Sequence, residues 1–348
     1  MNEFVEYAVN VVAIPAVVGT LAAVPVLVGP LRRRPAMVEG VVAVSIATAF
    51  LLSFGRELDA NAILRQFATI PNDTQAIERW HRLAFAAIVL GIAAPVVAAA
   101  RGLVRPGGRP VVTALAAVLA AASAGLLVQF PRATVEGQVW QGALCVLATL
   151  GFARFSREAA VWAAWVSFGV LAVLALEGGF ASLAVMSGAL SAASFGIGSA
   201  DAVGGWLARR GTPAAGGPSA EPGSPVRWPE GLAGSGALAL VLGTMVALVA
   251  RCGQAYDQQE IPAWAWTLAP LLPFAGVAFG DFARRTPSRA RTVFWRALGT
   301  MLLGAALLAV LLLARAATND ESPSDASDPM DGIYGAVPGA ENSAVSVS

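Results

Sequence analysis

Residues 8–54 read AVNVVAIPAVVGTLAAVPVLVGPLRRRPAMVEGVVAVSIATAFLLSF, two apolar runs separated by three consecutive arginines. Each run is close to the roughly 20 residues that an α-helix needs to cross the hydrocarbon core of a bilayer. Basic residues stay on the cytoplasmic side of membrane proteins. The stretch therefore predicts two membrane-spanning helices with Arg32, Arg33 and Arg34 in the cytoplasm.

The same alternation of apolar runs and polar gaps continues along the chain. The predicted spans cover residues 8–30, 36–54, 80–100, 111–130, 138–153, 159–177, 180–206, 231–250, 263–280 and 293–314. We therefore expect an all-α, polytopic integral membrane bundle of about ten transmembrane helices. The fifth run is the shortest, so nine helices are the nearest alternative.

The basic residues, all of them arginine, fall in alternate gaps between these runs. If the first run enters from outside, the cytoplasmic gaps hold 16 of the 23 arginines and 6 of the 22 acidic residues. The two faces then carry net charges of +10 and −9, which give the +1 of the whole chain. This asymmetry follows the positive-inside rule. With ten spans, the N-terminus and the C-terminus both lie outside, and we expect the cell membrane of a bacterium, its inner membrane.

Composition excludes several classes of protein. Hydrophobic residues make up 57% of the chain and charged residues 13%, against about 25% charged residues in soluble domains. The expected partner is the lipid bilayer, not nucleic acid. A partner membrane protein or a second copy of the chain is compatible with this class.

Histidine, cysteine and lysine are too scarce for most catalytic or cofactor chemistry. The chain has one histidine, His81, two cysteines, Cys145 and Cys252, and no lysine. One histidine cannot build a bis-histidine haem, a three-histidine zinc site or a di-iron site, and a Schiff base requires lysine. We predict that the protein is not an enzyme and holds no cofactor or metal.

Composition also divides the chain into parts. Residues 211–230 contain five prolines and four glycines, which predicts a flexible cytoplasmic linker between a seven-span domain at 1–210 and a three-span domain at 231–315. Residues 316–348 are rich in Ser, Asp and Gly and predict a disordered acidic tail. In the gap 55–79, apolar residues at helical spacing predict an amphipathic helix on the outer surface.

A stripe of small residues marks the seventh predicted span. Ser187, Ser191 and Ser194 lie on it together with Gly188 and Gly196. Small residues let membrane helices approach closely, and their hydroxyls bond across the interface or back to their own helix. The alternative interpretation is a hydroxyl-lined path for a small solute.

Two carboxylates, Glu39 and Asp201, lie near the cytoplasmic ends of predicted spans. Charged groups inside a bilayer are costly unless they are paired or hydrated. Near an interface such a carboxylate either supports the structure or faces a cavity that is open to the cytoplasm. Both interpretations stay open.

Prolines interrupt three predicted spans, and each leaves a backbone carbonyl that needs another donor. They are Pro15, Pro25, Pro95, Pro270 and Pro273. Broken helices of this kind form the binding sites of many transporters. Proline is also common as a simple kink in membrane helices.

An outer cluster is predicted where the third span begins. Trp80, His81 and Arg82 enter that span, and Glu57 and Asp59 lie in the same outer gap. A histidine among carboxylates could sense pH or hold a ligand. The simpler interpretation is an interfacial aromatic residue beside an arginine that extends to water.

From these patterns we expect a transporter, with a scaffold as the alternative. The proline-interrupted spans favour a transporter of a small neutral or amphipathic solute. The small-residue faces and the lack of charge in the middle of the spans favour a non-catalytic scaffold or accessory subunit of a membrane complex.

Overall fold

The computed structural model describes most of the predicted membrane segments. The described residues are 3–29, 31, 34–58, 79–104, 134–210, 236–282 and 289–320, with short pieces between 111 and 130. All regular elements in these ranges are helical. The chain forms two compact units, Met1–Leu308 and Ala309–Ser348, and the bundle belongs to the first.

Eight helices of the described residues are long and apolar enough to cross a membrane. They cover Val5–Val28, Pro35–Glu57, Arg82–Arg101, Arg157–Glu177, Ala181–Leu207, Gly236–Tyr256, Ala263–Asp281 and Thr292–Ala316. An all-α, multi-pass membrane protein is thereby confirmed, and its partner is the lipid bilayer.

The other two predicted spans have different outcomes. The fifth forms helix α7 (Val135–Ala153), which is not among the eight; its first half carries Glu136, Gln138 and Gln141. Half of the residues of the fourth, 111–130, lie outside the described residues. The predicted linker at 211–230 lies outside them entirely.

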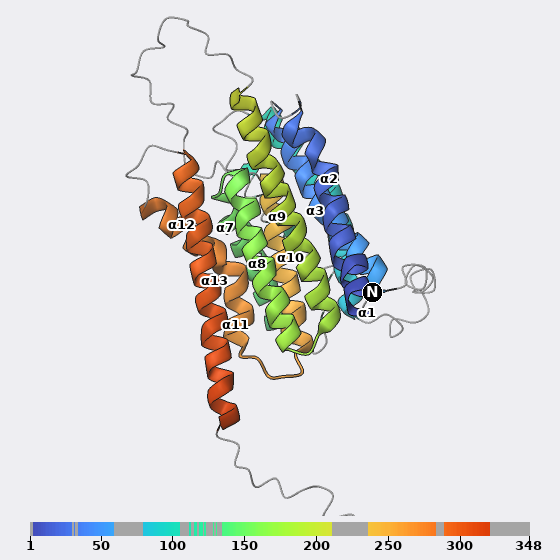
Figure 1. Ribbon diagram of the computed structural model, residues 1–348, viewed down its shortest axis with the longest axis vertical. Helices are drawn as coiled ribbons and strands as arrows, with labels where there is room; N and C mark the ends of the chain where they lie inside the picture. Colours follow the sequence, from blue (N-terminus) through green and yellow to red (C-terminus); the bar gives the residue numbers. More distant parts are fainter. Residues whose placement is uncertain are drawn as a thin grey trace, which may run out of the picture. The chain divides into compact units, whose positions relative to one another are not determined.

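The helices are labelled in Figure 1. Their bounds are α1 Glu3–Ala8, the π-helical turn η1 Val9–Ala13, α2 Ile14–Val28, α3 Pro35–Glu57, the 3-10 turn η3 Arg79–His81, α5 Arg82–Leu103, α8 Arg157–Glu177, α9 Ala181–Arg210, α10 Gly236–Tyr256, α11 Ala263–Leu268, the 3-10 turn η5 Ala269–Leu271, α12 Leu272–Phe282 and α13 Arg289–Asp320. Helix α13 thus continues five residues into the segment predicted to be disordered. The predicted surface helix falls on α3 as far as Glu57 and then on residues outside the described ranges.

Prolines act differently in the different spans. The ninth span is broken, because η5 separates α11 from α12 at Pro270. Helices α2 and α5 continue through Pro25 and Pro95. Pro15 lacks an amide hydrogen, so the carbonyl of Val11 loses its usual helical donor. The Ser53 hydroxyl of α3 donates to that carbonyl oxygen at 2.7 Å, which satisfies the freed group from a neighbouring helix.

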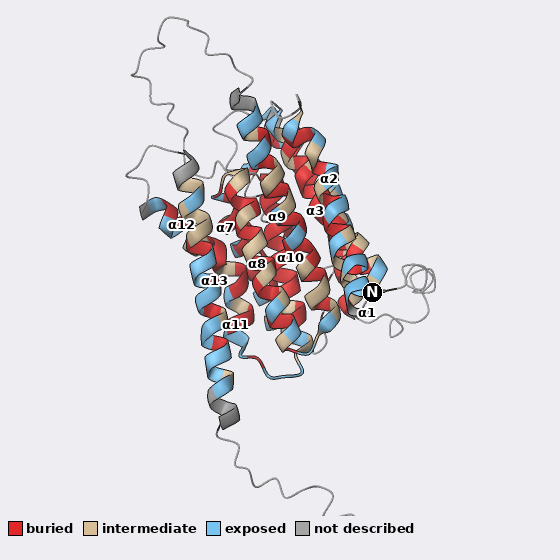
Figure 2. Ribbon diagram, viewed as in Figure 1, coloured by how far each residue is buried: buried red, intermediate tan, exposed pale blue. Residues whose placement is uncertain are grey.

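Helix α10 lies at the centre of the bundle. In its most apolar window 94% of the residues are buried, against 28% in α13, and Figure 2 shows the same contrast. The sequence GALALVLGTMVALVA is apolar on all sides, which is typical of a helix enclosed by others. Helices α3, α5, α7 and α8 all pack on it.

The other helices flank this centre. Helix α9 packs on α8, and α2 and α3 pack on α9. Helices α11 and α12 lie on the other flank, against α7, α8 and α10 (Figure 1). Helices α8 and α9 are joined by a tight turn in which Gly179 has a φ of 77°, a left-handed conformation that favours glycine.

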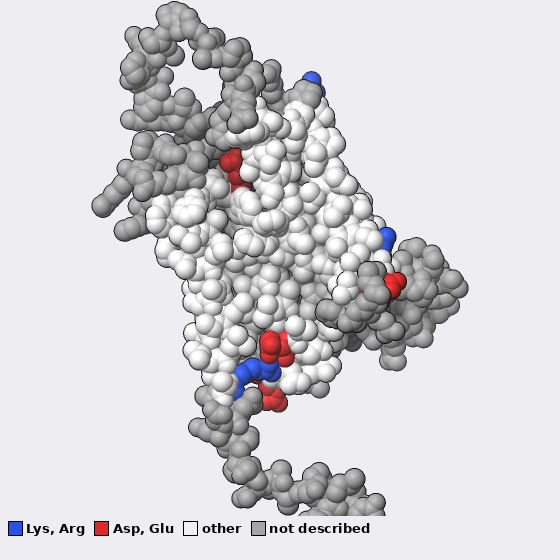
Figure 3. Space-filling model, in the orientation of Figure 1, with Lys and Arg blue, Asp and Glu red and all other residues white. Residues whose placement is uncertain are grey.

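The ends of the helices meet at two levels. Arg101 of α5 and Arg157 of α8 lie at one level, which we call the arginine end, with their partners on α3 and α9. Trp80 contacts both Phe54 and Phe180 at the opposite level, the aromatic end. Between the two levels the face seen in Figure 3 is largely free of charge. Such a band is typical of a surface that contacts lipid.

Candidate functional site

The three predicted serines of α9, Ser187, Ser191 and Ser194, are buried. Ser187 donates to the carbonyl of Leu183 in its own helix at 2.7 Å. Ser191 donates to the carbonyl of Trp165 in α8 at 2.9 Å. The Ser194 hydroxyl is fully buried, with no hydrogen-bond partner among the described residues. Two of the three hydroxyls therefore make the helix bonds that small-residue packing predicts.

The glycines of α9 face two different helices. A β-carbon at Gly198 would lie 3.0 Å from the Trp162 ring of α8, and one at Gly196 would lie 2.3 Å from the Thr20 hydroxyl of α2. At Gly188 the nearest atom would be 4.0 Å away. The small-residue stripe thus serves close packing on α8 and α2.

Asp201 is paired with Arg157 of α8. The Arg157 Nη2 lies 2.7 Å from Oδ1, and its Nε lies 3.0 Å from Oδ2. The two side chains are 16% and 4% exposed. This fork-shaped pair is the strong geometry for arginine and carboxylate, and it joins α8 to α9 at the arginine end.

Glu39 is paired with Arg101 of α5, through a single nitrogen of the guanidinium group. The Arg101 Nη1 lies 3.0 Å from Oε1 and 3.1 Å from Oε2 of Glu39. The two side chains are 9% and 13% exposed. Both predicted carboxylates therefore bind arginines of a neighbouring helix, which the sequence did not identify as partners.

Glu57 joins three helices at the aromatic end. It accepts a hydrogen bond from the Tyr7 hydroxyl of α1 and another, of 2.7 Å, from the Ser182 hydroxyl of α9. Arg56, beside it, donates to the carbonyl of Asn10 at 3.3 Å. Tyr7 and Ser182 belong to this site and were not predicted. Asp59 lies outside the described residues.

Trp80 and His81 lie in an aromatic cluster. The Trp80 ring is 5.8 Å from Phe54 and 5.3 Å from Phe180, and the His81 ring is 5.9 Å from Phe54. Phe180 in turn lies 5.5 Å from Tyr256. Trp80 is 4% exposed, so it packs inside the bundle, whereas an interfacial belt residue would face lipid. Arg82 begins α5 and is half-buried.

Arg251 is a charged residue that the predicted span boundaries missed. The eighth span was expected to end at residue 250, but α10 continues to Tyr256. Arg251 is half-buried against α7, where its Nη2 lies near Gly137. Its Nη1 bonds to Gln254, and its Nε is buried without a partner among the described residues. Because arginine is charged, a span predicted from hydropathy ends before it. Arginine nevertheless has a high helix propensity, so the helix itself continues.

Further buried hydroxyls lie inside the bundle. Ser167 of α8, Thr149 of α7 and Thr244 of α10 are fully buried and have no hydrogen-bond partner among the described residues. Ser167 is the middle residue of its span. Buried polar atoms of this kind call for an explanation, such as a functional role or bound water.

The polar and aromatic side chains at both ends of the bundle contact residues of neighbouring helices. Carboxylates are held by arginines, a tyrosine or a serine of other helices, and aromatic rings fill the space between helix ends. Comparison with protein-family models, with curated proteins and with solved structures finds no match for the chain.

Proposed function

We propose that the chain is a non-catalytic scaffold or accessory subunit of a membrane complex. The observation that carries this proposal is the position of α10, whose apolar window is 94% buried. A helix packed against α3, α5, α7 and α8 occupies the axis along which a solute path would run. Interhelical bonds at Glu39, Glu57 and Asp201 hold neighbouring helices together at both ends. A rigid, cross-linked bundle suits a scaffold.

The proline-interrupted spans support this choice over transport. A transporter site would form where the first, seventh and ninth spans converge. The first span packs on α9, which is the seventh. The broken ninth span, α11 to α12, lies on the other flank with α7, α8 and α10. The two proline-rich spans are therefore separated by α8 and α9.

A transporter of a small neutral or amphipathic solute is the second candidate. The observation in its favour is the set of buried hydroxyls without described partners, at Ser194, Ser167, Thr149 and Thr244. Hydroxyls in the middle of a bundle can bind a polar solute or water. These four side chains are shared among α7, α8, α9 and α10.

Thiol labelling separates the two functions. We expect single cysteines at Ser187, Ser191 and Ser194, in a Cys145→Ala, Cys252→Ala background, to resist a water-soluble thiol reagent, because all three positions are enclosed by helices. A cysteine at Ala181, which is exposed at the start of α9, is the reactive control. Rapid labelling at Ser194 in a folded protein would exclude the scaffold and support transport.

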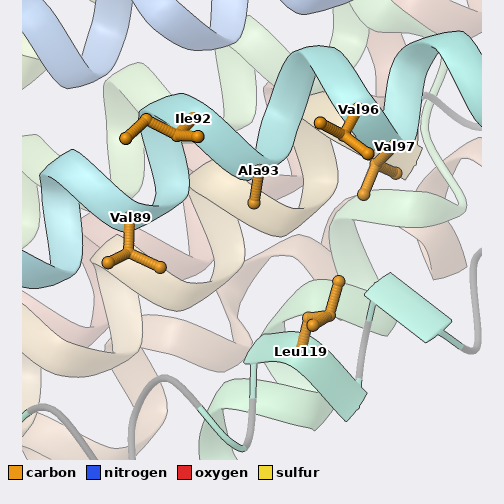
Figure 4. Close-up of a pocket in the computed structure, with 6 residues that line it drawn as sticks. All are labelled: Val89, Ile92, Ala93, Val96, Val97 and Leu119. Atoms are coloured by element: carbon orange, nitrogen blue, oxygen red, sulfur yellow. The ribbon is translucent and has the colours of Figure 1, made fainter.

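We also propose ten membrane crossings with both termini outside a bacterial cell membrane. Helix α5 ends at the arginine end, near Arg101. Helix α7 begins at the opposite end, because Gly137 lies beside Arg251 near the end of α10. Val104, after α5, and Thr134, before α7, therefore lie at opposite ends of the bundle. Leu119 faces α5 across an apolar cavity of about 260 Å³, as Figure 4 shows, which supports a crossing there.

Reporter fusions test this topology. Fusions after Arg34, Arg109, Arg210 and Arg291 should be active in the cytoplasm, since otherwise arginine-rich gaps would have to be translocated. A fusion after Asp320 should be active outside. Cytoplasmic activity at that last position would require an odd number of crossings.

A further inference from the structure

A groove runs along the lipid-facing side of α3, between α2 and α5. Its volume is about 350 Å³, and nearly all of its lining is apolar. The floor is a stripe of α3 at positions i, i+4, i+7 and i+11. These residues are Met37, Val41, Val44 and Thr48. Ala22 of α2 and Ala99 of α5 form the walls.

The length of the groove matches one leaflet of a bilayer. Its lining on α3 extends from Ala36 to Thr48, which is about 18 Å at 1.5 Å per residue. Half of the hydrocarbon core is about 15 Å. The groove starts at the arginine end and ends near the middle of the span. An acyl chain of that leaflet likewise runs from the membrane surface to the bilayer centre.

The mouth of the groove is basic. Arg34 is exposed and immediately precedes α3, two residues before Ala36, which lines the groove. The first turn of α3 has no acidic residue. Glu39 lies nearby, but both of its oxygens are bound by Arg101. An anionic group at this mouth would therefore meet positive charge.

We propose that this groove binds a phospholipid, with an acyl chain along α3 and an anionic headgroup against Arg34. The site is independent of the scaffold function, because it uses the outside of the bundle. A bound lipid would fill the space between α2, α3 and α5. It would also make the protein sensitive to the anionic lipid content of its membrane.

Native mass spectrometry of the full-length protein tests the site. The purified protein is reconstituted in vesicles of phosphatidylglycerol or phosphatidylcholine with identical acyl chains and then extracted. We expect wild type to retain one phosphatidylglycerol about fivefold more often than phosphatidylcholine, the effect of one arginine near an anionic lipid. Arg34→Gln should remove that preference. In the Ala99→Phe variant the phenyl ring fills the groove, so this variant should retain little of either lipid.

Ala100→Phe is the matched control, because Ala100 is also exposed on α5 but does not line the groove. It should retain lipid as wild type does. If Ala99→Phe fails to fold, Thr48→Phe blocks the deep end instead. Equal retention of the two lipids by wild type would overturn the headgroup site. Equal retention of phosphatidylglycerol by the groove-filling variant and its control would overturn the groove.

Discussion

Gly243→Ala is expected to separate α7 from α10 and to destabilise the whole bundle. A β-carbon at residue 243 would lie 2.4 Å from the backbone nitrogen of Thr149 and 2.7 Å from the carbonyl carbon of Ala148. These are backbone atoms, which cannot rotate away as a side chain can. Overpacking a close-packed core typically costs 1 to 3 kcal/mol, so we expect a loss of about 3 kcal/mol at this central helix. Unfolding in mixed micelles, followed by circular dichroism, measures it.

Two glycines of α9 provide graded controls. At Gly196 the new methyl group would meet Thr20, a side chain that can move, so the loss should be smaller. At Gly188 the nearest atom would be 4.0 Å away, so Gly188→Ala should change stability by less than about 0.5 kcal/mol. If the Gly243→Ala and Gly188→Ala variants unfold at the same denaturant concentration, the result contradicts a close contact between α7 and α10.

Asp201→Leu is expected to lower stability by about 3 kcal/mol, because it leaves the Arg157 charge without its partner at a helix interface. Replacing a buried ion pair by two apolar residues is often neutral. The double variant Arg157→Leu, Asp201→Leu should therefore recover most of the loss. A double-mutant cycle in the same unfolding assay measures the coupling.

The cycle also distinguishes the two interpretations of Asp201. A structural pair gives strong coupling between Arg157 and Asp201. A carboxylate that served a cavity open to the cytoplasm would give additive effects on stability, together with a change in uptake. Additive losses in the double variant would contradict the ion pair as a determinant of the fold.

The positions of the spans were predictable because membrane insertion depends on local composition. A run of about 20 apolar residues forms a helix in lipid whatever its neighbours are, since its backbone groups must be satisfied within the segment. The predicted spans at 36–54 and 159–177 lie inside the observed helices Pro35–Glu57 and Arg157–Glu177. The predicted end of a span was wrong where the helix continues through a charged residue, as at Arg251.

The sequence identified which carboxylates lie near helix ends, but not which residues pair with them. The sequence placed Glu39 and Asp201 near helix ends, where carboxylates are tolerated. Their partners, Arg101 and Arg157, are 62 and 44 residues away in the chain. Of the predicted outer cluster, the structure brings Trp80 and His81 together and assigns Glu57 to a separate bond network with Tyr7 and Ser182.

The sequence by itself determined that this is a multi-pass membrane protein, because its arginines and apolar runs alternate along the chain. Only the tertiary structure decided that α10 is enclosed while α13 is exposed. The physical reason is that lipid is as apolar as a protein core, so both helices carry the same kind of residue. Which faces meet depends on close contacts such as Gly243 with Thr149, and those form between helices that are distant in the chain.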